Sequence, residues 1–400
     1  MRSLLLFDVD GVLVEAHGYL RALQDTVAHF SRCMGVGDHP PSEVEVRALE
    51  AHGLTSEWDS GAACVAFLLL ERLRRDPALS LPAVWAEALA FLGAHSLVLP
   101  NPDYAALAAR IGARPRGEMG MAAGARLQLW EEAQFLPEPQ RRAFAALLDQ
   151  LLGTAYEFTC APVMHYFQHL VLGHEGVAAT YGAVPDFESV PYLRTYDLPL
   201  LDEAARTQVL NAVQAGQVGA VIYTARPSLP PAGVADSPLG YSSEAEAARA
   251  LVGLEPLPLI GLGRLQWLAS RTGESAEALV KPSPVQALAA IGAAVSGDEV
   301  AALEAALRFH REGLLLPPLS DLGETVVHVF EDTPGGLRAV QHAAALLQEA
   351  GLPMTVQPYG IAPAESPKAA LIAELGAPVF PSINHALAFS GIAGILPASL

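Results

Sequence analysis

Two aspartates, one residue apart, follow a short apolar run near the start of the chain. In the segment LLLFDVDGVLVE, Asp8 and Asp10 come directly after four apolar residues, and Gly11 follows them. Two carboxylates that point into one cleft repel each other, and a bound divalent cation removes that cost. Mg²⁺ prefers oxygen ligands and usually completes its shell with waters or a substrate phosphate. The segment therefore indicates half of a metal site.

Three later segments carry polar side chains at comparable places. Thr224 ends the apolar run VGAVIYT, Lys281 stands in LVKPSP before a helix, and Glu331 and Asp332 end TVVHVFED. Only two lysines occur in the chain, so a lysine at such a place is a rare event. In an open parallel sheet, ligands bind beyond the carboxyl ends of the strands. We therefore expect these side chains to gather at one edge of a sheet.

These segments resemble, motif by motif and in order, the haloacid dehalogenase (HAD) superfamily of hydrolases, in its magnesium-dependent phosphatase and phosphomutase branch. DVDGVLV looks like the nucleophile motif, and IYTARP looks like the second motif, a strand that ends in Thr or Ser. VKPSP looks like the lysine motif, and FEDTPGGLRAVQHA looks like the acidic motif that opens a helix. The resemblance covers 1–15 and most of 196–390. It implies an aspartyl-phosphate mechanism that depends on Mg²⁺.

Each residue can be given a task. A carboxylate such as Asp8 can attack phosphorus and form an aspartyl-phosphate. Asp10 is expected to protonate the leaving oxygen and then to activate water, because the glycine after it lets the chain turn sharply there. Thr224 can donate a hydrogen bond to a phosphoryl oxygen, and Lys281 supplies fixed positive charge.

The predicted site can be stated as two sets of residues. The metal set is Asp8, Asp10, Glu331 and Asp332, with Asp10 contributing its backbone carbonyl by resemblance. The set that binds substrate is Gly11, Thr224, Ala225, Arg226 and Lys281. The first and second motifs lie far apart in the sequence, so only the fold can bring the sets together.

The preferred function is hydrolysis of a small phosphomonoester. A phosphomutase or phosphotransferase would use the same residues and stays as an alternative. A non-catalytic binding or scaffold protein on the same fold is an alternative from a different class. Dehalogenase activity is disfavoured because the acidic metal motif would be unnecessary, and a phosphonatase would need a lysine that 16–194 lacks.

Two other polar patterns have weaker functional interpretations. His165 and His169 are spaced i, i+4 on an expected helix, where a packed helix face is favoured over a zinc site. Arg114 and Arg116 lie in RPRGEMG, where a solvated turn is favoured over an anion clamp.

Composition limits the classes of partner and compartment. The chain has 400 residues with 24 basic and 43 acidic side chains, a formal net charge of −19. That balance argues against nucleic acid, whose phosphates need Lys and Arg. The three cysteines form no zinc or disulfide pattern, and no apolar run is long enough for a membrane span. We expect a cytoplasmic protein that acts on a small phosphorylated metabolite, with no membrane partner; the oligomeric state is not predictable.

The elements that must position these residues follow from hydrophobic periodicity. Strands are expected at 3–7, 218–224, 257–262, 325–330, 354–360 and 378–380, with a possible extended piece near 187–195. Helices are expected between the later strands, at 201–215, 243–252, 264–272, 284–294, 335–350 and 367–375. Strand–helix alternation predicts an α/β fold, a Rossmann-like parallel sheet with helices on both faces.

The region between the first two motifs has a helical period instead. Helices are expected at 17–32, 42–52, 60–75, 82–94, 102–111, 138–152 and 158–172. We therefore predict a catalytic core formed by 1–15 and 195–400, with a helical insertion near 297–316. Residues 16–194 are predicted to form a large helical cap domain that closes over the core and carries specificity.

Overall fold

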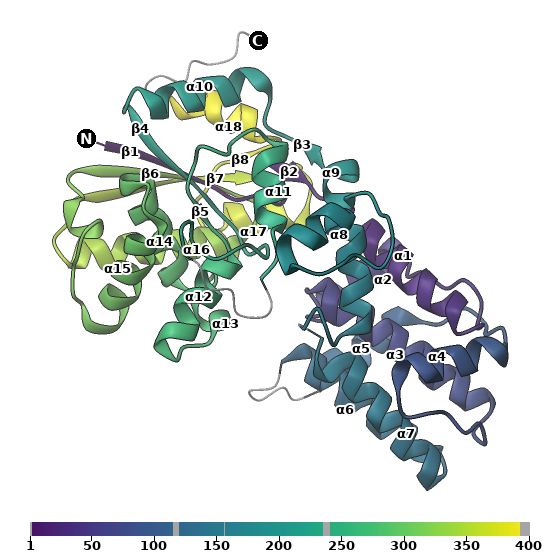
Figure 1. The fold of residues 1–400 in the computed structure, drawn as a ribbon. Coiled ribbons are helices and arrows are strands. Elements are labelled where there is room, and N and C mark those ends of the chain that lie inside the picture. Colours follow the sequence, from purple (N-terminus) through teal and green to yellow (C-terminus); the bar gives the residue numbers. More distant parts are fainter. Residues whose placement is uncertain (1, 115–119, 156, 235–240, 393–400) are drawn as a thin grey trace. The chain divides into compact units, whose positions relative to one another are not determined.

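A computed structural model describes residues 2–114, 120–155, 157–234 and 241–392 (Figure 1). The chain divides into two compact units. Unit 1 is Met1–Ala16 with Tyr196–Leu400, and unit 2 is His17–Thr195. No helix among the described residues is both long enough and apolar enough to cross a bilayer.

Unit 1 is built on a parallel sheet with the strand order β5-β4-β1-β6-β7-β8. The predicted α/β fold with a parallel sheet is confirmed. The chain begins in the middle of the sheet, moves to one side and returns to the other, so the order reverses around β1. The strands are β1 (Arg2–Phe7), β4 (Val218–Tyr223), β5 (Leu259–Ile260), β6 (Thr325–Glu331), β7 (Met354–Ile361) and β8 (Val379–Phe380).

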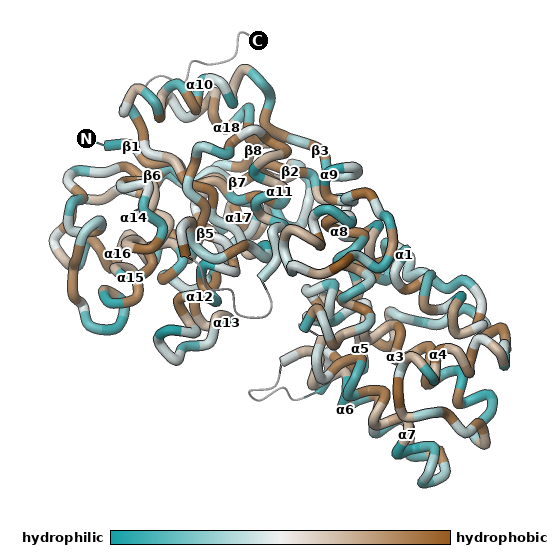
Figure 2. The backbone as a smooth tube through the Cα atoms, viewed as in Figure 1, coloured by the Kyte–Doolittle hydropathy of each residue, from teal (hydrophilic) through white to brown (hydrophobic). Residues whose placement is uncertain are grey.

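Both faces of this sheet are buried. Successive side chains of a strand point to opposite faces, and apolar residues occupy both sets of positions. Leu4 and Leu6 pack into one core cluster, whereas Leu5 and Phe7 pack into the other. Figure 2 shows brown, hydrophobic stretches along the tube inside this unit. A strand that is covered on both faces reads as a continuous hydrophobic run, which explains the LLLF that precedes Asp8.

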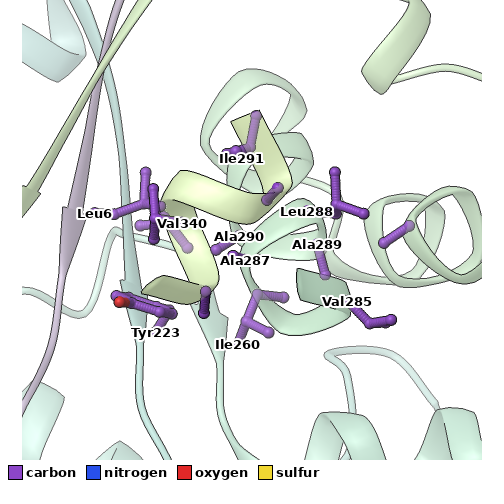
Figure 3. Close-up of a cluster of buried hydrophobic side chains, with 14 of the residues drawn as sticks. Leu6, Tyr223, Ile260, Val285, Ala287, Leu288, Ala289, Ala290, Ile291 and Val340 are labelled. Carbon is purple, nitrogen blue, oxygen red and sulfur yellow. The ribbon is translucent and has the colours of Figure 1, made fainter. Parts of the chain in front are cut away.

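Helices cover the two faces of the sheet. Figure 1 shows α14, α15 and α16 on one side of it and α10 and α18 on the other. In the first cluster, Val285 and Ile291 of α14 pack near Leu6, Tyr223 and Val340 (Figure 3). The helices of unit 1 are α10 (Glu203–Gln214), α11 (Glu244–Leu251), α12 (Leu262–Thr272), α13 (Ala276–Leu279), α14 (Pro284–Ser296), α15 (Glu299–Glu312), α16 (Pro334–Glu349), α17 (Pro367–Ala373) and α18 (Ile383–Ser390), with a short 3₁₀ turn at Leu319–Asp321.

Three helices beside the strand ends share one type of start. Ser283, Thr333 and Ser366 are the N-cap residues of α14, α16 and α17, and a proline occupies the first helical position of each. Each hydroxyl accepts a hydrogen bond from a backbone N–H of the first turn. Proline loses nothing there because that N–H has no helical partner. These starts fix the loops that carry Lys281 and Asp332 and the first helical turn that carries Lys368.

Unit 2 is helical throughout its named elements. Its central helix, α3 (Glu57–Arg75), is buried almost continuously from Trp58 to Leu70. Around it lie α1 (Gly18–Cys33), α2 (Glu43–Ala51), α4 (Trp85–Ala94), α5 (Tyr104–Gly112), α6 (Met121–Glu132), α7 (Glu138–Leu148) and α8 (Pro162–Tyr181), with short turns at Ala133–Phe135 and Asp149–Gly153. The possible extended piece near 187–195 is wrong, because that segment runs into α9 (Tyr192–Tyr196).

The two ends of the insertion are held together inside each unit. In unit 1, β2 (Val14–Glu15) pairs antiparallel with β3 (Leu198–Pro199). In unit 2, the hydroxyl of Tyr192 donates to the carboxylate of Asp25 on α1 at 2.9 Å. The two points where the chain passes between the units therefore lie next to the β2–β3 pair and to the hydrogen bond from Tyr192 to Asp25.

Candidate active site

A tight turn directly after β1 presents the two aspartates. The carbonyl of Val9 accepts hydrogen bonds from the N–H groups of residues 12, 13 and 14, and the N–H of Gly11 donates to Val14. Gly11 has a φ of +74°, in the left-handed region that favours glycine. The turn separates Asp8, which is buried, from Asp10, whose side chain is partly exposed.

Arg226, from the loop after β4, donates hydrogen bonds to the Asp10 carboxylate. The Arg226 Nε lies 2.9 Å from one carboxylate oxygen, and the guanidinium also reaches the other oxygen at 2.5 Å. The same guanidinium donates to Asp197 at 3.2 Å. Arg226 and Asp197 are both buried. The predicted ligand-binding arginine is thus placed at the site, with its guanidinium engaged by two carboxylates.

Lys281 is brought to Asp8, as the sequence predicts. Its ammonium lies 2.8 Å from Asp8 Oδ1 and 2.5 Å from Glu331 Oε1. It also stands 4.5 Å above the ring of Tyr223, a favourable place for a cation. Asp8, Glu331 and Tyr223 are buried in unit 1, and the Lys281 side chain is 9% exposed. The lysine therefore joins the carboxyl ends of β1, β4 and β6.

Glu331 accepts hydrogen bonds on both of its oxygens. Oε1 accepts from Lys281 and from the hydroxyl of Tyr223 at 3.0 Å. Oε2 accepts from the N–H and the hydroxyl of Thr333, at 3.0 and 2.8 Å. The side chain has no exposed surface, so its charge depends on these donors. A Cβ on Gly336 would lie 1.6 Å from Oε1, so only glycine fits against it.

Asp332 has a separate partner. Its Oδ2 forms an ion pair of 2.5 Å with Lys368, which lies in the first turn of α17. Asp332 is buried, whereas the Lys368 side chain is 47% exposed. Both lysines of the chain are therefore bound to carboxylates of the predicted metal set.

The loop after β4 is fixed by a buried glutamine of α14. Gln286 Nε2 donates to the carbonyls of Thr224 and Ile260, at 2.9 and 3.0 Å, and its Oε1 accepts from the N–H of Lys281 at 2.9 Å. The Thr224 hydroxyl accepts from the N–H of Arg226 at 3.2 Å. Ala225 lies exposed between them. Gln286 thereby locks the predicted substrate residues of this loop to the loop that carries Lys281.

Burial and charge shift the protonation equilibria of this cluster. Burial, reinforced by Glu331, raises the pKa of Asp8 well above its usual value. Burial alone would lower the pKa of Lys281, but Asp8 and Glu331 raise it on balance. Burial likewise opposes ionisation of Glu331, but Lys281 holds its pKa below the usual value. With its three carboxylates ionised, the cluster carries more negative charge than its two lysines balance.

The donor set fits a hard divalent cation. Oxygens of Asp8, Glu331 and Asp332 lie within 4.8 Å of one another, and all three residues are buried. Three carboxylates suit Mg²⁺, which takes oxygen ligands. Among the described residues, this is the one group of acidic, histidine or cysteine side chains close enough to share an ion. The Asp10 carboxylate is not part of it, because Arg226 binds it; the resemblance assigns Asp10 through its carbonyl.

Four residues of the site were not singled out from sequence. They are Tyr223, Gln286, Lys368 and Asp197. Gln286 was detectable as a polar residue in the otherwise apolar stretch PVQALAAIGAAV, and Lys368 was detectable as the second of two lysines. Tyr223 and Asp197 carry no such signal, because their partners lie far away along the chain.

The weaker patterns have structural partners. His165 bonds the carbonyl of Phe158 and the carboxylate of Asp186, and His169 bonds the carbonyl of His165. The favoured packed-helix interpretation fits these contacts. Arg114 pairs with Glu131, while Arg116 lies outside the described residues.

Comparisons with known proteins show similarity of fold. No family model and no curated protein matches the chain. A structural genomics target solved by X-ray crystallography matches with a TM-score of 0.63 at 14% identity, over 98% of this chain and 99% of that chain. A phosphatase from Thermococcus thioreducens matches with a TM-score of 0.38 at 14% identity, over 88% and 91% of the two chains. The first match shows the fold and carries no function.

Proposed function

We propose that this protein is a HAD-type, Mg²⁺-dependent phosphatase that hydrolyses a small phosphomonoester through an aspartyl-phosphate. The observation that carries the proposal is the contact of Lys281 with both Asp8 and Glu331, at the carboxyl ends of β1 and β6. A buried carboxylate beside a fixed ammonium and two further acids is poorly explained as a stabilising device, because burying charge is costly. It is well explained as an incomplete site for a cation and a phosphate.

In the proposed reaction, Asp8 attacks phosphorus and the ester oxygen leaves. Lys281 and the Thr224 hydroxyl offset the charge of the transferred phosphoryl group, since preorganised donors stabilise the charge that develops in the transition state. Water then attacks the acyl-phosphate, which restores Asp8 and releases inorganic phosphate. Asp8, Glu331, Asp332 and the Asp10 carbonyl would hold Mg²⁺, which supplies charge neutralisation and in-line orientation of the phosphoryl group.

Asp10 is proposed to protonate the leaving oxygen and then to take a proton from the attacking water. Its carboxylate would need to be held while remaining accessible. Arg226 binds this carboxylate through Nε and one terminal nitrogen, and the Asp10 side chain is still 41% exposed. We therefore assign Arg226 the task of positioning Asp10, in place of the direct contact with the ligand expected from sequence.

The remaining parts of the proposal concern the surroundings of the reaction. The helical unit 17–195 is proposed to be the family's cap and to select the substrate. The cytoplasm is the proposed compartment, and a small phosphorylated metabolite is the proposed partner.

The first test is turnover of an aryl phosphate and of a panel of metabolite phosphates, with and without Mg²⁺. Asp8→Asn should abolish turnover, by at least about 10³-fold, because the amide cannot act as the nucleophile. Asp321→Asn, an exposed carboxylate of the same unit, is the matched control and should keep wild-type turnover.

Circular dichroism and thermal unfolding check that Asp8→Asn still folds. Unchanged turnover in that variant would remove the nucleophile assignment. If the wild type turns over no phosphate in a metal-dependent way, the alternative of a non-catalytic binding or scaffold protein is favoured. Interconversion of hexose-phosphate isomers without phosphate release would favour the mutase.

A further inference from the structure

The cations of the site differ sharply in accessibility. The side chains of Lys281 and Arg226 are 9% and 2% exposed, and each is engaged by two carboxylates. Lys368 is 47% exposed and is bound to Asp332. An anion that arrives from solvent can therefore reach Lys368 without breaking a buried ion pair.

The position of Lys368 also separates it from the four sequence motifs. It belongs to α17, which follows β7, the strand next to β6. It reaches across to the carboxylate that directly follows β6. Lysine has a flexible four-carbon stem and a compact charge, so its ammonium can change partner at little cost.

The charges around the site leave room for one divalent cation. Five carboxylates face three cations in this cluster, so two negative charges remain when all five are ionised; the carboxylates are Asp8, Asp10, Asp197, Glu331 and Asp332. A divalent ion that binds Asp332 competes for this carboxylate with the ammonium of Lys368, which is paired with Oδ2. A half-exposed ion pair is worth little, of the order of 1 kcal/mol or less, so the ion can win this competition.

We propose that Lys368 is an exchangeable counter-ion, which holds Asp332 before the metal binds and turns to the incoming phosphate once the metal has taken Asp332. This inference rests on the metal site of the proposed function and adds a residue that determines metal and anion affinity. The Lys368 ammonium pairs with Asp332 before the metal binds and contacts the phosphate afterwards.

The proposal makes two predictions of opposite sign for Lys368→Gln. Mg²⁺ should bind more tightly, by about three- to tenfold, because the competing cation is gone. Inorganic phosphate should bind more weakly at saturating Mg²⁺, by about threefold or more, because one cationic contact is gone. Lys368→Arg should keep both affinities close to the wild type. A residue needed only for folding would weaken both.

Isothermal titration calorimetry on the full chain measures both affinities, first with Mg²⁺ alone and then with inorganic phosphate at saturating Mg²⁺. Arg338→Gln is the matched control, since it removes one exposed positive charge from the neighbouring helix α16. It should change each affinity by less than about twofold. Thermal unfolding with and without Mg²⁺ gives a second measure of metal affinity.

Different outcomes separate this proposal from the proposed function. If wild type and variants bind Mg²⁺ equally, the exchange proposal fails while the metal site stands. If Lys368→Gln binds phosphate as tightly as wild type, the second half of the exchange is wrong. If no variant and no wild-type protein binds Mg²⁺, the proposed function and the exchange both fail.

Discussion

At the scale of single residues, the site depends on how closely the chain approaches Glu331. The two glycines of TPGG lie side by side, but their surroundings differ. A Cβ on Gly336 would overlap the Glu331 carboxylate, whereas a Cβ on Gly335 would meet nothing within 4 Å. Glu331 in turn binds Lys281, which binds Asp8. One methyl group on the helix can therefore disturb Asp8, the proposed nucleophile, through Glu331 and Lys281.

We expect Gly336→Ala to destabilise the protein by about 2 kcal/mol or more, because Glu331 must leave donors that its buried charge requires. Turnover should fall as well, since Lys281 loses one of its two partners. Gly335→Ala should be neutral or stabilising by up to about 1 kcal/mol, because alanine favours a helix. Urea unfolding measures the free energy and an aryl phosphate assay measures turnover. Equal effects of the two substitutions would contradict the contact with Glu331.

At the scale of elements, β6 carries both a residue of the candidate site and a buried histidine away from it. His328 lies three residues before Glu331 on this strand, and its Nδ1 is 3.2 Å from the hydroxyl of Tyr359 on β7. Burial lowers the pKa of His328 to about 4, from the ordinary value of 6.5. Between these two pH values, His328 is therefore protonated in the unfolded chain and neutral in the folded chain.

The sign of the pH dependence follows from this difference. The contribution of His328 to stability is fully present above pH 6.5 and is lost as the pH falls through about 4. We expect the free energy of unfolding to fall by about 3 kcal/mol more in the wild type than in His328→Gln over this range. Urea unfolding at several pH values measures it. His310→Gln, at an exposed histidine of α15, should retain the wild-type slope; a steep slope in His328→Gln would contradict the assignment.

The elements themselves were largely predictable, and the reasons are physical. Buried strands such as LLLF and VGAVIY are long apolar runs, and Ser-Pro or Thr-Pro marks the start of α14, α16 and α17. Local patterns of this kind survive tertiary folding. The helices α6, α9, α13 and α18 and the pair β2–β3 were missed. The helix α6 lacks a clear apolar stripe, α9 and α13 have five and four residues, and the paired strands have two residues each.

The site was predictable in its residues and less so in its contacts. Asp8, Lys281, Glu331 and Asp332 could be assigned to one edge because strand ends meet there. The grip of Arg226 on Asp10 could not be derived, since the two are 216 residues apart and the choice between a carboxylate and a ligand is made by geometry. The same holds for the partner of Lys368.

At the scale of the whole molecule, the insertion has the properties of an independent domain. Unit 2 has its own buried core around α3, and its first and last helices are joined by the bond from Tyr192 to Asp25. A compact unit whose ends lie together can often fold without its host. The domain limits proposed from sequence, 16–194, lie one residue from those of unit 2.

We expect a fragment of residues 17–195 to fold alone, with a helical circular dichroism spectrum and cooperative unfolding in urea. A fragment of residues 17–190 is the comparison, because it lacks Tyr192 and the rest of α9. It should be less stable by about 1.5 kcal/mol or more, the usual value of a hydrogen bond to a charged group. Non-cooperative unfolding of the longer fragment would show that unit 2 depends on unit 1.

The scarcity of lysine has a practical consequence for chemical probing. Of the cationic side chains, 22 are arginines, and the two side-chain amines both belong to the site. Acylating or reductively methylating reagents attack neutral amines, so the deeply buried and strongly paired Lys281 is protected, whereas the half-exposed Lys368 is open to them. The rate at which such a reagent labels lysine side chains in this protein therefore reports on the Nζ atom of Lys368, beside Asp332. The candidate site can therefore be followed with an unselective amine reagent and no engineered label.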